Sequence, residues 1–397
     1  MKRLLPVLAL LAACQQGPRV EELDGPHVSA RESADPALAI DAETGDLLLS
    51  WVEGDSAGYR LMFARSRDDA ASWTRPVAIT TSLDEVEPHA EASPRMVSAR
   101  GVIGIFWPKQ QRVPGRRFPA SQLRFARSTD GGATWSTPIT MNDDTASTAP
   151  AGHTFHGATV LGDSAFVVAW LDSRRVVDGA HGAGAAHHEG SSYVFSVASP
   201  DLGATWEPAN RKLWGDACPC CRISLAALGG DVLAAWRGHF AGDVRDIVTA
   251  PLRAAANPQR VHADNWVFPG CPHSGPALAT ANGQAHLAWF TGAPGRMGIY
   301  YARVGGAPIR VLGGAQLPAG HPALALFDDV AMVAVNLNQA GERVLSIARV
   351  ANDDVDVIEV PNTEGADHPQ LLRTAADRAL LAWKQNGRVR LARVLVQ

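Results

Sequence analysis

The sequence has few charged residues and no excess of either sign. Lys and Arg number 36 against 40 Asp and Glu, for a formal net charge of −4, and charged residues make up only 19% of the chain. A balance of this kind argues against a basic nucleic-acid-binding protein. At 46% hydrophobic residues the chain is also too apolar to be disordered, and at 397 residues it can bury a sizeable core.

Long apolar runs are missing beyond the N-terminus, where residues 165–171 are among the longest. None approaches the length of a membrane-spanning helix. What the chain does have is 37 Gly and 26 Pro spread along its length, together with 11 Trp, 13 His and five Cys. Abundant Gly and Pro predict many short strands joined by turns.

The N-terminus is typical of an exported protein. Lys2 and Arg3 precede an apolar stretch at 4–11, which ends in Leu11-Ala12-Ala13-Cys14. This pattern resembles a bacterial lipoprotein signal with its lipobox, whereas an ordinary secretion signal is the alternative. The resemblance implies a signal peptide at 1–13, lipidation of Cys14, a tether at 14–26, and a location at the outer membrane, on its periplasmic face or at the cell surface.

Three segments share the sequence pattern Ser-x-Asp-x-Gly-x-Thr-Trp, at 66–73, 128–135 and 199–206. The first departs from it, with Ala70 in place of Gly and Ser72 in place of Thr. The repeat resembles the Asp-box, or BNR repeat, of sialidase-like β-propellers. In such a box the Asp accepts turn N–H groups, the Gly takes a left-handed conformation and the Trp fills the gap between neighbouring sheets.

A longer repeat of about 55 residues covers the whole chain. Each repeat begins an apolar strand with a Pro or with another residue in its place. About fourteen residues later, a second residue, usually Trp, closes the next strand. The closing residues are Trp51, Trp107, Trp170, Trp236, Trp289, Val335 and Trp383. Seven such units predict an all-β propeller over residues 27–397 with seven blades, and the six-bladed sialidase type is the alternative. The last unit ends one strand short, so we expect a segment near residues 27–31 to complete its blade.

Sialidases bind the substrate carboxylate with three Arg, and this resemblance makes an exo-sialidase the first enzyme hypothesis. Asp35 occupies the place of the first of those Arg and would repel a carboxylate. Arg222, Arg245 and Asp246 are the remaining candidates for catalytic residues. The sequence therefore favours a ligand- or metal-binding protein, with a sialidase or another glycoside hydrolase as the alternative.

Cysteine and histidine residues gather where the repeats open. The motifs Cys218-Pro219-Cys220-Cys221 and Gly270-Cys271-Pro272-His273 begin adjacent units, and the residues that precede the Pro positions add further potential ligands to the same ring. The predicted metal ligands are His156, Cys220, Cys221, Cys271, His273, His321 and His368. Imidazole and thiolate together suit copper or zinc.

A disulfide between Cys271 and one of Cys218, Cys220 or Cys221 is the competing interpretation, because an exported protein meets oxidising conditions. Residues 216–290 also resemble exported sialidase-like proteins of unassigned function that carry a Cys-x-Cys-Cys motif. A glycine-rich insertion at 174–190 contains four more potential ligands and is either a lid or a surface loop. A carbohydrate or an envelope protein is the expected partner, besides the membrane that the lipid would enter.

Overall fold

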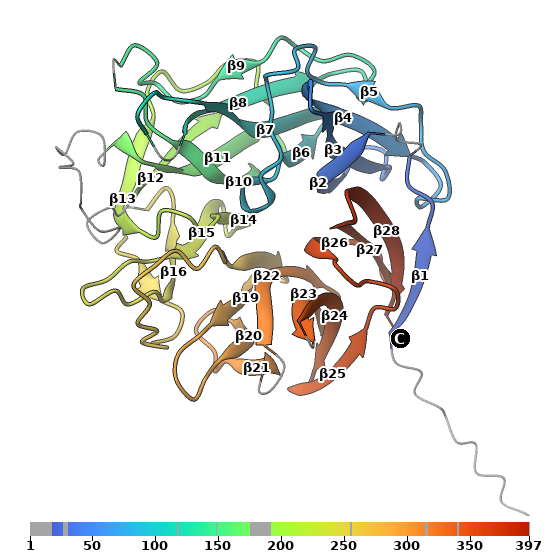
Figure 1. The fold of residues 1–397 in the computed structure, drawn as a ribbon, viewed down its shortest axis with the longest axis vertical. Helices are drawn as coiled ribbons and strands as arrows, with labels where there is room; N and C mark the ends of the chain where they lie inside the picture. The colour runs from blue at the N-terminus through green and yellow to red at the C-terminus, as the bar shows by residue number, and fades with distance from the viewer. Residues whose placement is uncertain are drawn as a thin grey trace, which may run out of the picture.

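The computed structural model describes residues 18–26, 31–116, 119–147, 149–174, 192–254, 256–313, 317–339 and 341–396. Seven four-stranded antiparallel sheets surround a central axis, and the chain passes round the ring once (Figure 1). The prediction of a seven-bladed propeller is confirmed. No helix in the described part of the chain is long and apolar enough to cross a membrane.

The first four blades each run from the innermost strand outward. Blade 1 comprises β2 (Glu32–Ile40), β3 (Leu47–Asp55), β4 (Gly58–Ser66) and β5 (Val77–Ala78). Blade 2 comprises β6 (Arg95–Ala99), β7 (Val102–Gln111), β8 (Ala120–Ser128) and β9 (Ile139–Thr140), preceded by the 3-10 turn η1 (Ala90–Ala92). Blade 3 comprises β10 (His153–Leu161), β11 (Ala165–Asp172), β12 (Ser192–Ser199) and β13 (Arg211–Ala217). Blade 4 comprises β14 (Ser224–Leu228), β15 (Asp231–Arg237), β16 (Ile247–Pro251) and β17 (Gln259–Arg260).

The last three blades follow the same order, except that the seventh takes its outer strand from the other end of the chain. Blade 5 comprises β18 (Ala277–Ala281), β19 (Gln284–Thr291), β20 (Gly298–Arg303) and β21 (Ile309–Gly313). Blade 6 comprises β22 (Leu317–Leu326), β23 (Val330–Gln339), β24 (Glu342–Ala351) and β25 (Asp354–Glu359). Blade 7 comprises β26 (Asp367–Ala375), β27 (Arg378–Gln385), β28 (Arg388–Leu395) and β1 (Arg19–Leu23).

The N-terminal strand closes the ring, but not where the sequence placed it. β1 pairs with β28 from Arg19 opposite Leu395 to Leu23 opposite Leu391. The closing strand therefore lies at 19–23, inside the segment expected to be a tether, and residues 27–30 lie outside the described residues. The physical reason is the distance that the chain must span. The outer strand of blade 7 lies at the rim, whereas β2 is innermost and begins at Glu32, so a strand at 27–31 would leave no residues to cross from the rim to the axis.

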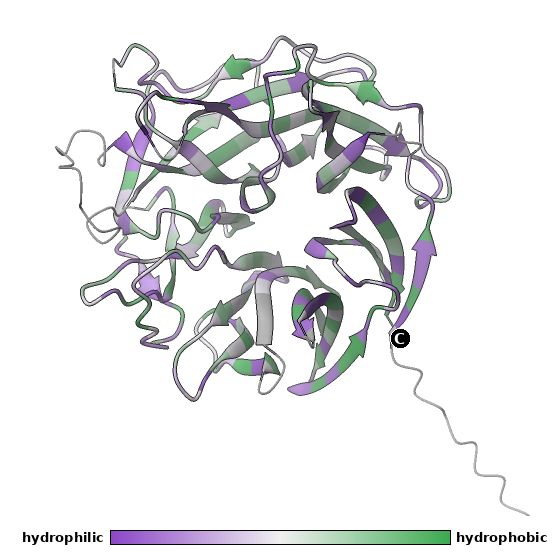
Figure 2. Ribbon diagram, in the orientation of Figure 1, coloured by the Kyte–Doolittle hydropathy of each residue, from purple (hydrophilic) through white to green (hydrophobic). Residues whose placement is uncertain are grey.

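The residues that close the second strands form the core between blades. All seven, six Trp and Val335, are at most 3% exposed. In Figure 2 the middle strands are mostly hydrophobic, whereas β1 at the rim is mostly hydrophilic. Bulky rings in this place fill the wedge that widens outward between neighbouring sheets.

The Asp-boxes have the expected local geometry. In the second box, Thr134 donates through its N–H to Asp130 Oδ1 at 2.9 Å and through its hydroxyl to Oδ2 at 2.6 Å. Trp135 packs edge-on against Phe63 of blade 1, with ring centroids 5.3 Å apart. The box therefore fixes blade 2 against blade 1 at the outer rim, far from the axis.

Candidate metal centre

The innermost strands of blades 1, 6 and 7 open with the same backbone irregularity. Asp35, His321 and His368 all take left-handed conformations, with φ of 52°, 58° and 51°. The strand register shifts at each of these positions. A β-bulge redirects a side chain, and a left-handed residue other than Gly costs about 1–2 kcal/mol. Phe155 of blade 3 takes the same conformation at an equivalent register shift, with φ of 56°, so four blades bear this cost.

Glu91, on the 3-10 turn before blade 2, joins four blades beside the axis. Its Oε1 accepts the backbone N–H groups of Arg222 at 3.1 Å and Gly275 at 2.8 Å. Its Oε2 lies 2.7 Å from Nδ1 of His321. Burial opposes its ionisation, but the charges of His321 and Arg222 prevail and hold the pKa of Glu91 far below its usual range. Glu91 is thus a buried anion that ties blades 4, 5 and 6 to blade 2.

His321 and His368 form a pair across blades 6 and 7. Their ring centroids are 3.9 Å apart with the planes inclined by 36°. Asp367 Oδ1 lies 2.8 Å from His368 Nδ1, so each imidazole has a carboxylate beside its Nδ1. Burial lowers the pKa of His368, although Asp367 opposes the shift. Potential ligand atoms of Glu91, His321 and His368 all lie within 4.8 Å of one another.

A second cluster is built from thiols at the opening of blades 4 and 5. The Sγ of Cys218 lies 3.8 Å from that of Cys220 and 3.4 Å from that of Cys221, and all three residues are at most 5% exposed. Cys220 also shares a group with Cys271 and His273, both exposed, whose potential ligand atoms lie within 4.8 Å of one another. These four described cysteines are free thiols, and no pair among them is joined in the structure.

Hydrogen bonds and nearby cations divide the thiols into two kinds. Bonds from Cys220 and Cys221, with the charges of Arg245 and Arg237, hold the pKa of Cys218 well below its usual range. A bond from Cys220 and the charge of Arg245 lower the pKa of Cys271. The pKa of Cys220 is raised because it donates to its neighbours, and that of Cys221 is raised by burial. The geometry thus favours thiolates at both ends of the cluster.

The spacing of the sulfur atoms suits a single cation. Zn²⁺ binds thiolates at about 2.3 Å in a tetrahedral arrangement, which puts two sulfur ligands about 3.8 Å apart. The observed 3.4 Å and 3.8 Å separations lie close to this value without any change of backbone. Buried sulfur donors beside Arg side chains also suit Cu(I), which prefers soft ligands.

The predicted catalytic candidates have structural partners. Asp246 accepts the N–H groups of Asn265 and Trp266 and pairs with Arg260 at 3.1 Å, on the side of blade 4 away from the axis. Arg245 donates to the carbonyl of Phe268 at 3.3 Å and acts on the thiols through its charge. Arg222 is the one candidate of the three that lines the central channel.

The metal ligands predicted from the sequence lie in three places in the structure. Cys220, Cys221, Cys271 and His273 form the thiol cluster, together with Cys218, which the predicted ligand set omitted. His321 and His368 stand with Glu91, a residue that sequence reasoning missed. His156 belongs to neither group: its Nε2 lies 3.1 Å from the carbonyl of Phe106, and burial with the charge of Arg95 lowers its pKa to about 3.

Two further predictions lie outside the described residues. One is the signal peptide with lipidated Cys14, and the other is the insertion at 175–190 with His181, His187, His188 and Glu189. Arg174, at the start of that insertion, is described and pairs with Asp172 at 2.9 Å.

No family model matches this chain, and no curated protein matches it. Solved structures do. A polysaccharide lyase of family PL25, an ulvan lyase, aligns with a TM-score of 0.58 and 14% identity over 92% of this chain and 94% of its own. The polysaccharide lyase Uly1 aligns with a TM-score of 0.54 and 10% identity over 91% and 90%. The Hadza microbial sialidase Hz136 aligns with a TM-score of 0.52 and 13% identity over 92% of this chain and 66% of its own.

The chain has a sialidase-like propeller fold. At these identities the likeness concerns the fold alone, and this chain spans about two thirds of the length of Hz136. Neighbours that share the architecture include both a sialidase and lyases, so the fold by itself does not select a reaction. The function has to be argued from the residues at the axis.

Proposed function

We propose that this protein is a metal-binding propeller that holds a soft cation, copper(I) or zinc, with its ligands drawn from Cys218, Cys220, Cys221, Cys271 and His273. The observation that carries the proposal is the convergence of three buried sulfur atoms at 3.4 and 3.8 Å. Buried thiols at ligand spacing, beside two guanidinium groups that favour thiolates, are the donor set that such cations select.

The elements around the cluster hold it in place. Arg237 donates two hydrogen bonds to the carbonyl of Ser274, at 3.0 and 2.9 Å, and one to the carbonyl of Arg245. Cys218 donates its N–H to the carbonyl of Arg237 at 2.8 Å. Arg237 therefore connects the two cysteine-bearing segments, through its backbone carbonyl to Cys218 and through its guanidinium to Ser274, which supports a preorganised site.

Metal analysis of the full-length chain, purified without chelator and under reductant, tests the proposal. We expect one equivalent of copper or zinc, lost in Cys220→Ser because Cys220 belongs to both ligand groups. His286→Asn is the matched control, since His286 bonds Tyr301 in blade 5 and stands apart from the cluster. A thiol count on unreduced protein separates the alternatives: no metal and four oxidised cysteines would establish the disulfide instead.

The alternative, a glycoside hydrolase, has less support at the axis. Asp35 accepts the N–H of His89, and burial raises its pKa to about 6, so the position offers an acid where a carboxylate-binding Arg would be needed. Turnover of a fluorogenic sialoside that is lost in Arg222→Met would reverse this ranking.

We also propose that the protein is exported and lipid-anchored through Cys14, at the outer membrane. The support is the signal pattern at 1–14 and the position of β1, which begins at Arg19 on the rim of blade 7. Radiolabelled palmitate should enter the wild-type protein but not Cys14→Ser.

A further inference from the structure

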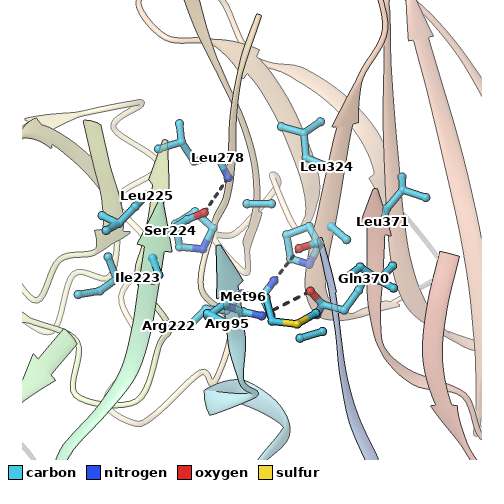
Figure 3. A pocket seen from close by; sticks show the side chains of 18 residues that line it. Arg95, Met96, Arg222, Ile223, Ser224, Leu225, Leu278, Leu324, Gln370 and Leu371 are labelled. Atoms are coloured by element: carbon cyan, nitrogen blue, oxygen red, sulfur yellow. Dashed lines mark hydrogen bonds between the residues drawn. The ribbon is translucent and has the colours of Figure 1, made fainter. Parts of the chain in front are cut away.

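A cavity of about 180 Å³ lies in the central channel, and every innermost strand contributes to its wall. Figure 3 shows how its side chains are arranged: Leu225, Leu278, Leu324 and Leu371 surround one part, and Arg95 and Arg222 lie together at another. The cavity is partly open to solvent, and more of its accessible lining is polar than apolar. Two guanidinium groups in such a space require an explanation.

Arg95 lines this cavity and makes its hydrogen bonds through one nitrogen. Its three hydrogen bonds all leave from Nη1, to Ser93 Oγ at 3.0 Å, the carbonyl of Pro94 at 3.5 Å and Gln370 Oε1 at 3.4 Å. Within the described part of the chain, no hydrogen bond leaves from Nε or Nη2, so both are available to a ligand. That edge of a guanidinium is the fork that binds two oxygens of one anion.

Arg222 reaches the same cavity from blade 4. Its Nη2 donates to the carbonyl of Pro322 at 2.7 Å, while Nη1 has no hydrogen-bond partner among the described residues. The side chain of Arg222 is 6% exposed, and the nearest carboxylate oxygen, Glu91 Oε2, is 3.7 Å from Nη1. A buried N–H group without a partner costs about 1–3 kcal/mol, which a bound acceptor would recover.

The carboxylates whose charges act on Arg95 are Glu91 and Asp35, and Asp35 accepts the N–H of His89. Glu91 is engaged by His321 and by two backbone N–H groups. His156 is neutral because burial and Arg95 hold its pKa near 3. Burial, and after it the charge of Arg222, lowers the pKa of Arg95 itself to about 9. The two guanidinium groups therefore repel one another in the structure.

We propose that this cavity binds a small tetrahedral oxyanion, of the class of sulfate and inorganic phosphate, between Arg95 and Arg222. Two guanidinium groups that approach from different blades suit an anion whose oxygens point in several directions, better than a planar carboxylate held by one fork. The site is distinct from the thiol cluster and does not depend on the metal. Binding would remove the repulsion between the two side chains and give Arg222 Nη1 its partner.

Calorimetric titration of the full-length, metal-free protein with sulfate, phosphate and acetate at constant ionic strength tests this. We expect saturable binding of sulfate or phosphate at one site, at least tenfold tighter than acetate. Arg95→Met should weaken it tenfold or more, whereas Arg100→Met, which removes a surface guanidinium paired with Asp163, should change it less than twofold. Acetate binding as tight as sulfate, or equal affinity in Arg95→Met, would overturn the proposal.

Thermal unfolding adds a readout that separates folding from binding. Arg95→Met should melt at or above the wild-type temperature in anion-poor buffer, because the repulsion is gone, yet lose the stabilisation that sulfate gives the wild-type protein. Selenate soaked into crystals should show anomalous density between Arg95 and Arg222. Density elsewhere only, or sulfate stabilisation that persists in Arg95→Met, would count against the site.

Discussion

Oε2 of Glu91 lies 2.7 Å from Nδ1 of His321, although 230 positions separate the two residues in sequence. The same carboxylate accepts the N–H of Arg222, next to the Cys218–Cys221 segment, and that of Gly275, two residues after His273. One buried side chain thus orders both ligand groups at the axis.

Replacing Glu91 should therefore disturb the contacts that join blades 2, 4, 5 and 6 beside the axis. Breaking a buried ion pair by removing one partner costs about 3–5 kcal/mol, because the other charge is left uncompensated. We expect Glu91→Ala to lower the free energy of unfolding by that amount in a urea titration. Glu87→Ala, at an exposed position four residues earlier, should change it by less than about 0.5 kcal/mol.

Metal binding should stabilise the fold, because the proposed ligands come from two blades. Zinc at a hundredfold excess over its dissociation constant should raise the free energy of unfolding by about 2.7 kcal/mol. Chelator should remove this gain, and Cys271→Ser, which deletes a ligand from blade 5, should largely abolish it. Equal melting temperatures of wild type and Cys271→Ser at every zinc concentration would contradict a bridging role.

His153 should make stability depend on pH. Its Nε2 lies 3.1 Å from Asp144 and 3.4 Å from Asp172, and although burial opposes the charge, these carboxylates raise its pKa above 6.5. A raised folded-state pKa gives stability that is fully present below the unfolded-state pKa and is lost as the pH rises through the folded-state value. The stability difference between wild type and His153→Gln should therefore shrink from pH 6 to pH 9. A difference that stays constant or grows over this range would show that the ion pairs do not hold the proton.

The Asp-box glycine of blade 2 should not tolerate a side chain. Gly132 has φ of +91°, and a Cβ built there would meet the ring of Phe63 at 2.0 Å. Gly132→Ala should cost about 2–4 kcal/mol, combining the left-handed penalty with overpacking. Ala70 is the matched control, since it already takes φ of 63° at the equivalent position. In Ala70→Gly, relief of strain is offset by about 0.8 kcal/mol for the lost methyl, so thermal unfolding should shift little.

The fold could be predicted because its determinants are local and repeated. Each Trp that closes a second strand and each Asp-box depends on residues a few positions apart, so a 55-residue period carries the architecture. The closing strand was misplaced because its position depends on the distance from rim to axis, which only the ring itself sets.

The site could be predicted only in part. The sequence by itself determined that Cys and His residues stand at equivalent positions of successive blades and must therefore approach one axis. It could not identify Glu91, because its partners lie 131, 184 and 230 residues away and it sits two residues before the position, Ser93, that the repeat aligns. Only the tertiary structure decided which ligands share a group and which side chains line the cavity, since the bulges at Asp35, His321 and His368 and the approach of the innermost strands depend on packing between neighbouring blades.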